Sequence, residues 1–194
     1  MILTIQHQET YSRGQLLLRA FFGSIYIGIP HLFLLYFLMI WGAILSFIAW
    51  WAVLFTGKYP QSFFNYQLNL KKWSLRVSAR LVHMADGYPA FGMSSTDTNT
   101  NIELAYPEKL SRGLLILRTL FGGIYVIIPH GFILFFRAIA TYFLIFLSFW
   151  AILFTGKYPK SWFDFNVGTI RWAMRVGFYM SFMTDQYPPF NSKA

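Results

Sequence analysis

The chain has 194 residues, of which 56% are hydrophobic and only 12% carry a charge. Soluble domains contain about 25% charged residues, so this composition excludes a disordered chain and argues against an ordinary soluble domain. The net charge is +9 and cysteine is absent, which excludes disulfides and thiolate metal sites. A basic and strongly apolar protein fits the anionic face of a membrane better than it fits nucleic acid.

An internal repeat with an offset of 99 residues organises the chain. Positions 12–91 and 111–190 share 38 identical residues over 80 positions, and the whole run 54–60 recurs as 153–159. A Ser/Thr/Asn-rich stretch separates the copies and is too polar to bury a core. The sequence therefore predicts a polar N-terminal segment (1–11), a first membrane repeat (12–91), a polar linker (92–109), a second membrane repeat (110–190) and a short tail (191–194).

The first apolar run, residues 15–55, is too long for one crossing, because a bilayer core needs roughly 20 apolar residues per helix. It suits either one crossing plus an interfacial helix, or a two-helix hairpin that turns at Ile29-Pro30-His31. Arg19 lies near the start of this run, the other basic residues of the repeat flank it, and none lies near Pro30. A hairpin places both flanks on one side, which the positive-inside rule identifies as cytoplasmic. We therefore favour the hairpin, with both chain termini in the cytoplasm.

An amphipathic helix is predicted over Phe63–Met84, after the Thr-Gly-Lys-Tyr-Pro turn. Apolar side chains recur at steps of three and four residues, as on one face of a helix: Tyr66, Leu70, Trp73, Val77, Leu81 and Met84. The opposite face is polar and basic, which is typical of a helix lying in the membrane plane. The predicted fold is an all-α integral membrane protein of two tandem repeats, each a transmembrane helical hairpin followed by an in-plane amphipathic helix.

The second repeat carries a family resemblance. It lies in the segments 128–130, 153–159, 163–168, 171–172, 175–176 and 184–190. These residues resemble a bacterial membrane family catalogued as domain of unknown function 4389, and the whole chain looks like a tandem duplication of it. In the first repeat, Asn65–Asn69 departs from the pattern. The resemblance implies a polytopic protein of the bacterial cytoplasmic (inner) membrane and supplies no activity or catalytic residues.

Basic side chains of the turns and in-plane helices are the candidate contacts for anionic lipid headgroups. They are Lys58, Lys71, Lys72, Arg76, Arg80, Lys157, Lys160, Arg171 and Arg175. The turn around Lys58 and Lys157 is not a phosphate-binding P-loop, because that loop follows a strand and closes in Gly-Lys-Ser/Thr.

Three polar residues inside the apolar runs are candidates for a functional role: Arg137, His31 and His130. Arg137 replaces Leu38 of the first repeat, and it either contacts an ion, a substrate or a partner subunit, or snorkels to the outer headgroups. His31 and His130 follow equivalent prolines, and they either form a metal or proton-relay pair or are polar turn residues at the outer interface.

Two aspartates follow the predicted in-plane helices. Asp86 and Asp185 precede Tyr-Pro in both repeats and are predicted to occupy turns or to pair with Arg76 and Arg175. Structural ion pairs of this kind are more common than catalytic carboxylate pairs.

No nucleophile triad, haem or iron–sulfur motif, or zinc-ligand spacing is recognisable, so the sequence predicts neither an enzyme nor a bound cofactor or metal. It predicts a non-catalytic accessory or scaffolding subunit of a larger membrane complex. The partners expected are anionic lipids and other membrane subunits, or further copies of the chain. The alternative is an oligomeric small transporter or channel component that uses Arg137, His31 and His130.

Overall fold

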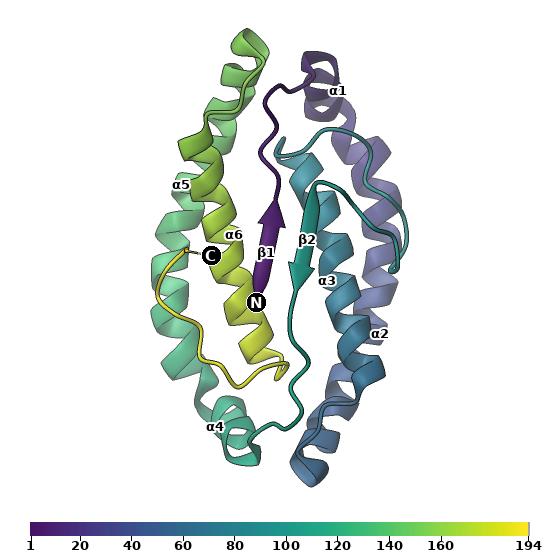
Figure 1. Ribbon diagram of the computed structural model, residues 1–194, viewed down its shortest axis with the longest axis vertical. Helices are drawn as coiled ribbons and strands as arrows, with labels where there is room; N and C mark the ends of the chain where they lie inside the picture. Colours follow the sequence, from purple (N-terminus) through teal and green to yellow (C-terminus); the bar gives the residue numbers. More distant parts are fainter. Residues whose placement is uncertain (194) are drawn as a thin grey trace.

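The computed structural model describes residues 1–193 and shows two similar helical halves joined by a short two-stranded sheet, called the ribbon below (Figure 1). The elements are β1 (Ile2–Ile5), α1 (Arg13–Gly23), α2 (Ile29–Thr56), α3 (Gln61–Leu81), β2 (Thr100–Glu103), α4 (Arg112–Gly122), α5 (Ile128–Thr155) and α6 (Lys160–Met180). Each helix of the second half (residues 100–193) begins and ends 99 residues after its counterpart in the first half (residues 1–99).

The predicted hairpin turns at Pro30 and Pro129 are not present. Five-residue π-helical segments, Ser24–Gly28 and Gly123–Ile127, join α1 to α2 and α4 to α5. The result is two unbroken helices of 44 residues each, Arg13–Thr56 and Arg112–Thr155, both long and apolar enough to cross a membrane.

Proline does not break these helices because its missing hydrogen bond is replaced from elsewhere in the chain. Pro30 lies in the first turn of α2, and its absent N–H leaves the carbonyl of Tyr26 without an α-helical donor. The Tyr88 hydroxyl donates to that carbonyl at 3.1 Å. In the second half, the Tyr187 hydroxyl donates to the Tyr125 carbonyl at 3.0 Å.

The long helices bury only one narrow side. In α2 the buried side chains follow one stripe along the helix: His31, Leu35, Gly42, Leu45, Ala49 and Val53. The other sides carry exposed large apolar side chains, among them Phe33 at 63% and Phe47 at 65% exposure. A helix that is apolar on every side has to be covered by protein or by lipid.

The apolar stripe predicted for the following helix packs on this buried side. Leu70, Trp73 and Val77 of α3 form one cluster with Ile27 and Leu35 of the long helix. The opposite face of α3 lies under the segment 92–99 rather than in solvent, which buries Arg76 and Arg80 to 2% and 3% exposure. The basic face predicted to meet water is therefore partly an internal face.

A two-stranded antiparallel sheet departs from the predicted all-α fold. β1 comes from the polar N-terminal segment and β2 from the linker, and each buries alternate side chains. Four residues of alternation are too few to distinguish a strand from a loop by sequence.

The two halves are related by a twofold rotation. Leu3 faces Ile102 in the sheet, and these residues are equivalent at the 99-residue offset, so the axis passes between them. Contacts between the halves are reciprocal: the N–H of Tyr11 donates to the Gly156 carbonyl, and the N–H of Leu110 donates to the Gly57 carbonyl, both at 2.8 Å. Such reciprocity defines a twofold interface. In Figure 1, α2 and α5 lie at symmetric positions on opposite sides of the central ribbon, and so do α3 and α6.

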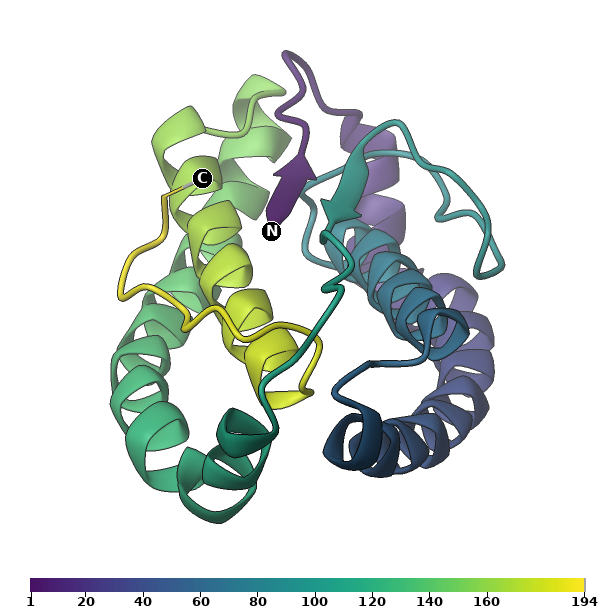
Figure 2. The ribbon, with the colours of Figure 1, turned by 60° about the horizontal axis from the view of Figure 1, so that its bottom comes forward.

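This symmetry determines where the ends of the long helices lie along the twofold axis, a position called height here. Arg13 donates to the Phe154 carbonyl at 3.0 Å and Arg112 to the Phe55 carbonyl at 2.8 Å, so each long helix starts beside the end of the other. The twofold carries Phe154 onto Phe55 without changing the height along the axis. Both ends of each long helix therefore lie at about the same height, and the helix bows around α3 or α6 between them (Figure 2).

Candidate functional site

His130 is the centre of a hydrogen-bonded aromatic cluster in the second half and is fully buried. The indole N–H of Trp172 donates to its Nδ1 at 2.9 Å. Because an indole only donates, the imidazole proton is on Nε2. Nε2 lies 3.1 Å from the Tyr187 hydroxyl and donates to it, since that hydroxyl donates to the Tyr125 carbonyl. Phe190 stacks on the imidazole at 3.9 Å between ring centroids.

His31 has the equivalent surroundings in the first half. The indole of Trp73 donates to its Nδ1 at 2.9 Å, and Phe91 stacks on the ring at 3.8 Å. Nε2 of His31 is buried without a hydrogen-bond partner among the described residues. Each histidine therefore joins the Tyr-Pro-x-Phe segment and α3 or α6 to the first turn of α2 or α5.

These clusters exclude one of the two alternatives for the histidines, that of polar turn residues at the outer interface, because both histidines are helical and buried. The structure also does not bring them together, since each contacts side chains of its own half. Within residues 1–193, no group of three or more potential metal ligands is present. The Trp, Tyr and Phe partners were not predicted from the sequence, although each is identical at the 99-residue offset.

Arg137 is held by α6. Its Nε donates to the Thr169 hydroxyl and its Nη2 to the Phe165 carbonyl, both at 3.2 Å, and the guanidinium lies 4.3 Å from the Phe165 ring centroid. In the first half the equivalent of Phe165 is Tyr66, whose hydroxyl donates to the Leu38 carbonyl at 2.8 Å. Arg137 thus joins α5 to α6 where Tyr66 joins α2 to α3.

The two aspartates form ion pairs, but the predicted partners were wrong. Asp86 lies 2.7 Å from Arg19 and Asp185 lies 2.5 Å from Arg118, both arginines being in the first segment of the long helices. The second oxygen of Asp185 accepts the backbone N–H of Ser111, just before α4. The aspartates therefore anchor the starts of the long helices.

Arg76 and Arg80 hold the linker against α3. Arg76 donates to the carbonyls of Gly92 and Ser95. Arg80 pairs with both carboxylate oxygens of Asp97, at 2.6 and 2.7 Å. Burial raises the pKa of Asp97, but the hydrogen bonds from Arg80 and Thr100 outweigh it, and the pKa lies below its usual value.

Arg171 and Arg175 hold the C-terminal segment in the same way. Arg171 donates to the carbonyls of Ser192 and Leu3 at 3.0 and 3.1 Å, and Arg175 donates to the Lys193 carbonyl at 2.7 Å. Of the predicted headgroup contacts, Lys58, Lys157 and Lys160 are exposed.

The lysines lie in three settings. Lys58 and Lys157 are exposed, each directly after a glycine with positive φ that ends a long helix. Lys160 is exposed and pairs with Asp164 at 2.8 Å. Lys71 and Lys72 of α3 are half-buried.

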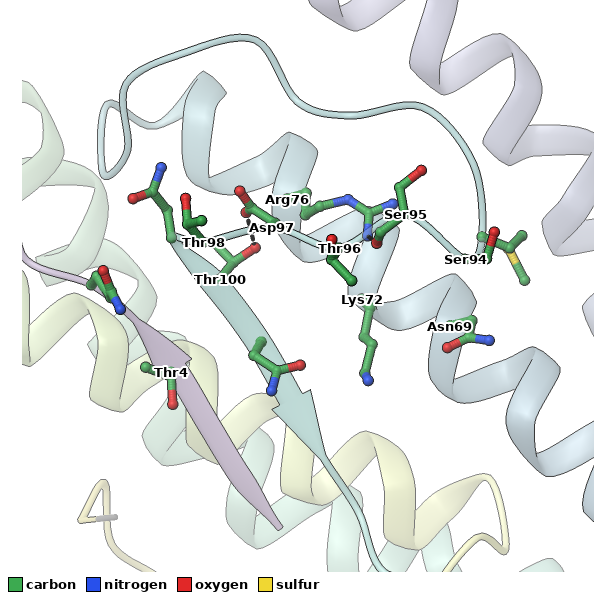
Figure 3. A pocket seen from close by; sticks show the side chains of 14 residues that line it. Thr4, Asn69, Lys72, Arg76, Ser94, Ser95, Thr96, Asp97, Thr98 and Thr100 are labelled. Carbon is green, nitrogen blue, oxygen red and sulfur yellow. Dashed lines mark hydrogen bonds between the residues drawn. The ribbon is translucent and has the colours of Figure 1, made fainter.

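A polar cavity of about 450 Å³ lies between α3, the ribbon and the linker. Figure 3 shows Lys72 extending from α3 toward the ribbon, with Arg76 and Asn69 on either side of it along the helix. Hydroxyl and amide side chains form most of the remaining wall: Thr4, Gln6, Ser94, Ser95, Thr96, Thr98, Asn99, Thr100 and Asn101. The linker residues were predicted only as a polar spacer.

Comparison with known proteins supports the family resemblance for one half of the chain. Residues 117–192 match the family described as Domain of unknown function (DUF4389). The matched segment includes the His130 cluster, Arg137 and the Arg118–Asp185 pair. No curated protein and no solved structure matches the chain.

Proposed function

We propose that the chain is a non-catalytic membrane protein, a tandem duplication that serves as a scaffolding or accessory subunit and contacts anionic lipid through its basic turns. The observation that carries the proposal is the exposed apolar surface of the long helices. Only 22% of the most apolar 18-residue stretch of the first long helix, and 6% of that in the second, is buried within the protein. Lipid is the solvent that would cover such a surface.

The twofold axis is proposed to stand along the membrane normal. An axis in the membrane plane would place the ribbon near mid-depth, where the exposed Thr4 and Asn101 and the open strand edges would lack water. With the axis along the normal, all four ends of the long helices face one side, together with Arg13, Lys58 and Lys157. Each long helix then enters the bilayer and returns to the same side, instead of the four crossings predicted from the sequence.

Cysteine labelling tests this orientation, because the chain has no cysteine of its own. Single cysteines at the exposed Thr10, Lys58, Lys109 and Lys157 are expected to react with an impermeant maleimide from the cytoplasmic side only. An in-plane axis would instead put Thr10 with Lys157 on one side and Lys58 with Lys109 on the other, following the backbone contacts between the halves. Ala79→Cys, fully buried, serves as the unreactive control.

Native mass spectrometry of protein gently extracted from its own membrane tests the subunit role. We expect a complex containing another polypeptide or further copies of the chain, with anionic lipid retained. The double variant Lys58→Gln/Lys157→Gln removes the two exposed lysines at the helix ends and is expected to reduce the retained anionic lipid. A lipid-free monomer would contradict the proposal.

The transporter alternative receives less support. Arg137 and the two histidines all direct their hydrogen bonds to α3, α6 or the segments that follow them. A transport role would require these bonds to break during each cycle.

A further inference from the structure

The cavity beside α3 distinguishes the two halves. In the second half, Ser192 occupies the equivalent place: a Cβ added to Gly168 would lie 2.8 Å from the Ser192 Cβ. Arg171 there donates to the carbonyls of Ser192 and Leu3. Protein oxygen atoms therefore occupy both terminal nitrogens of Arg171, while its Nε is buried without a hydrogen-bond partner among the described residues.

Lys72 is the equivalent of Arg171 and has no such partner. It lines the cavity, is half-buried, and makes no ion pair among the described residues. The Ser192 carbonyl on Arg171 shows where an oxygen atom of a ligand would meet the ammonium of Lys72. The Leu3 carbonyl corresponds to that of Ile102, which is already present in the first half. A compact ammonium with three donors suits a phosphate group.

A second cation in the wall is incompletely satisfied. Arg76 is 2% exposed and uses both terminal nitrogens on linker carbonyls, while its Nε is buried without a hydrogen-bond partner. The one carboxylate in the wall, Asp97, is neutralised by Arg80 and accepts the Thr100 hydroxyl. The cavity therefore carries uncompensated positive charge.

The rest of the wall favours a ligand with hydroxyl groups. Its serine, threonine, asparagine and glutamine side chains both donate and accept hydrogen bonds, as polyol hydroxyls require. Met93 is the apolar side chain among the lining residues.

We propose that this cavity binds a phosphorylated polyol, with its phosphate on Lys72 beside Arg76 and its hydroxyls on the ribbon and linker. The phosphate belongs either to a glycerophospholipid headgroup or to a soluble phosphate ester. The lipid source rests on the proposed function, because the headgroup reaches the cavity from the membrane surface. The soluble source does not.

The test uses the full chain in nanodiscs of phosphatidylcholine, titrated calorimetrically with glycerol 3-phosphate. We expect saturable binding, which the variant Lys72→Gln weakens about tenfold or more, as expected for loss of a charge-assisted hydrogen bond. Lys71→Gln is the matched control, because it removes the same charge from the next residue of α3, which lines the α3–α6 groove instead. In a second arm, protein from phosphatidylglycerol nanodiscs is released into a mass spectrometer and the retained lipid is counted for the same variants.

Binding in either arm that Lys72→Gln weakens and Lys71→Gln does not supports the proposal, and the arm that responds identifies the source. Absence of binding in both arms, or an equal loss in both variants, would overturn it. Neither outcome bears on the cysteine labelling at positions 10, 58, 109 and 157, so failure of the cavity and failure of the proposed membrane arrangement are told apart.

Discussion

Replacing Asp185 by asparagine is expected to lower the free energy of unfolding by about 3 to 5 kcal/mol, the cost of leaving a buried charge unpaired. Arg118 is 1% exposed and has this carboxylate as its counter-ion at 2.5 Å. Its other hydrogen bonds go to the carbonyls of Leu114, Tyr179 and Thr184, which carry no formal charge. Asparagine also weakens the acceptor for the Ser111 N–H at the start of α4.

The control is Asp164→Asn in the same half. Asp164 pairs with Lys160 at 2.8 Å, but the two side chains are 56% and 71% exposed. An exposed pair of this kind contributes about 0.5 kcal/mol. Denaturant unfolding of the detergent-solubilised protein measures both variants. Equal losses would show that Arg118 is solvated rather than dependent on Asp185.

The sequence repeat predicted the equivalence of the halves but not the continuity of the long helices. Proline followed by histidine within a long apolar run is an ordinary signal for a turn. The hydroxyl that donates to the carbonyl left free by Pro30 belongs to Tyr88, 58 residues further along the chain. A contact of that separation leaves no trace in local periodicity, although the recurrence of both residues at the 99-residue offset was a usable signal.

The candidate site was predicted only in part. Helix periodicity identifies the faces of a helix, but it does not show what covers each face. The apolar stripe of α3 was predicted, but its packing against the long helix, through Leu70, Trp73 and Val77, was not. The basic face was predicted to meet water or headgroups, yet the linker covers Arg76 and Arg80. This leaves Lys72 as the basic side chain on that face that is open to a ligand.

Acid sensitivity is expected from His83, which follows α3 in a left-handed conformation with φ 62° and is 9% exposed. Burial, helped by Arg19, lowers its pKa from 6.5 to about 4, against a smaller raising effect of Asp86. His83 therefore binds a proton near pH 6.5 in the unfolded chain, but only near pH 4 in the folded protein. Stability is full above pH 6.5 and falls as the pH drops toward 4. The loss reaches about 3 kcal/mol, from 1.36 kcal/mol per pKa unit.

The equivalent residue of the second half suggests a substitution that isolates the effect of His83. Phe182 occupies the equivalent position with φ 60°, so the backbone accepts an aromatic ring without a titrating group. His83→Phe is expected to fold with the same backbone and to lose the stability change between pH 6.5 and about 4, while retaining the loss at lower pH from paired carboxylates such as Asp97. Unfolding midpoints of the two proteins, measured from pH 7.5 to 4.5, give the comparison. Parallel curves would assign the acid sensitivity to other groups, because the ring that contacts Phe149 and faces Arg19 and Asp86 would then titrate equally in both states.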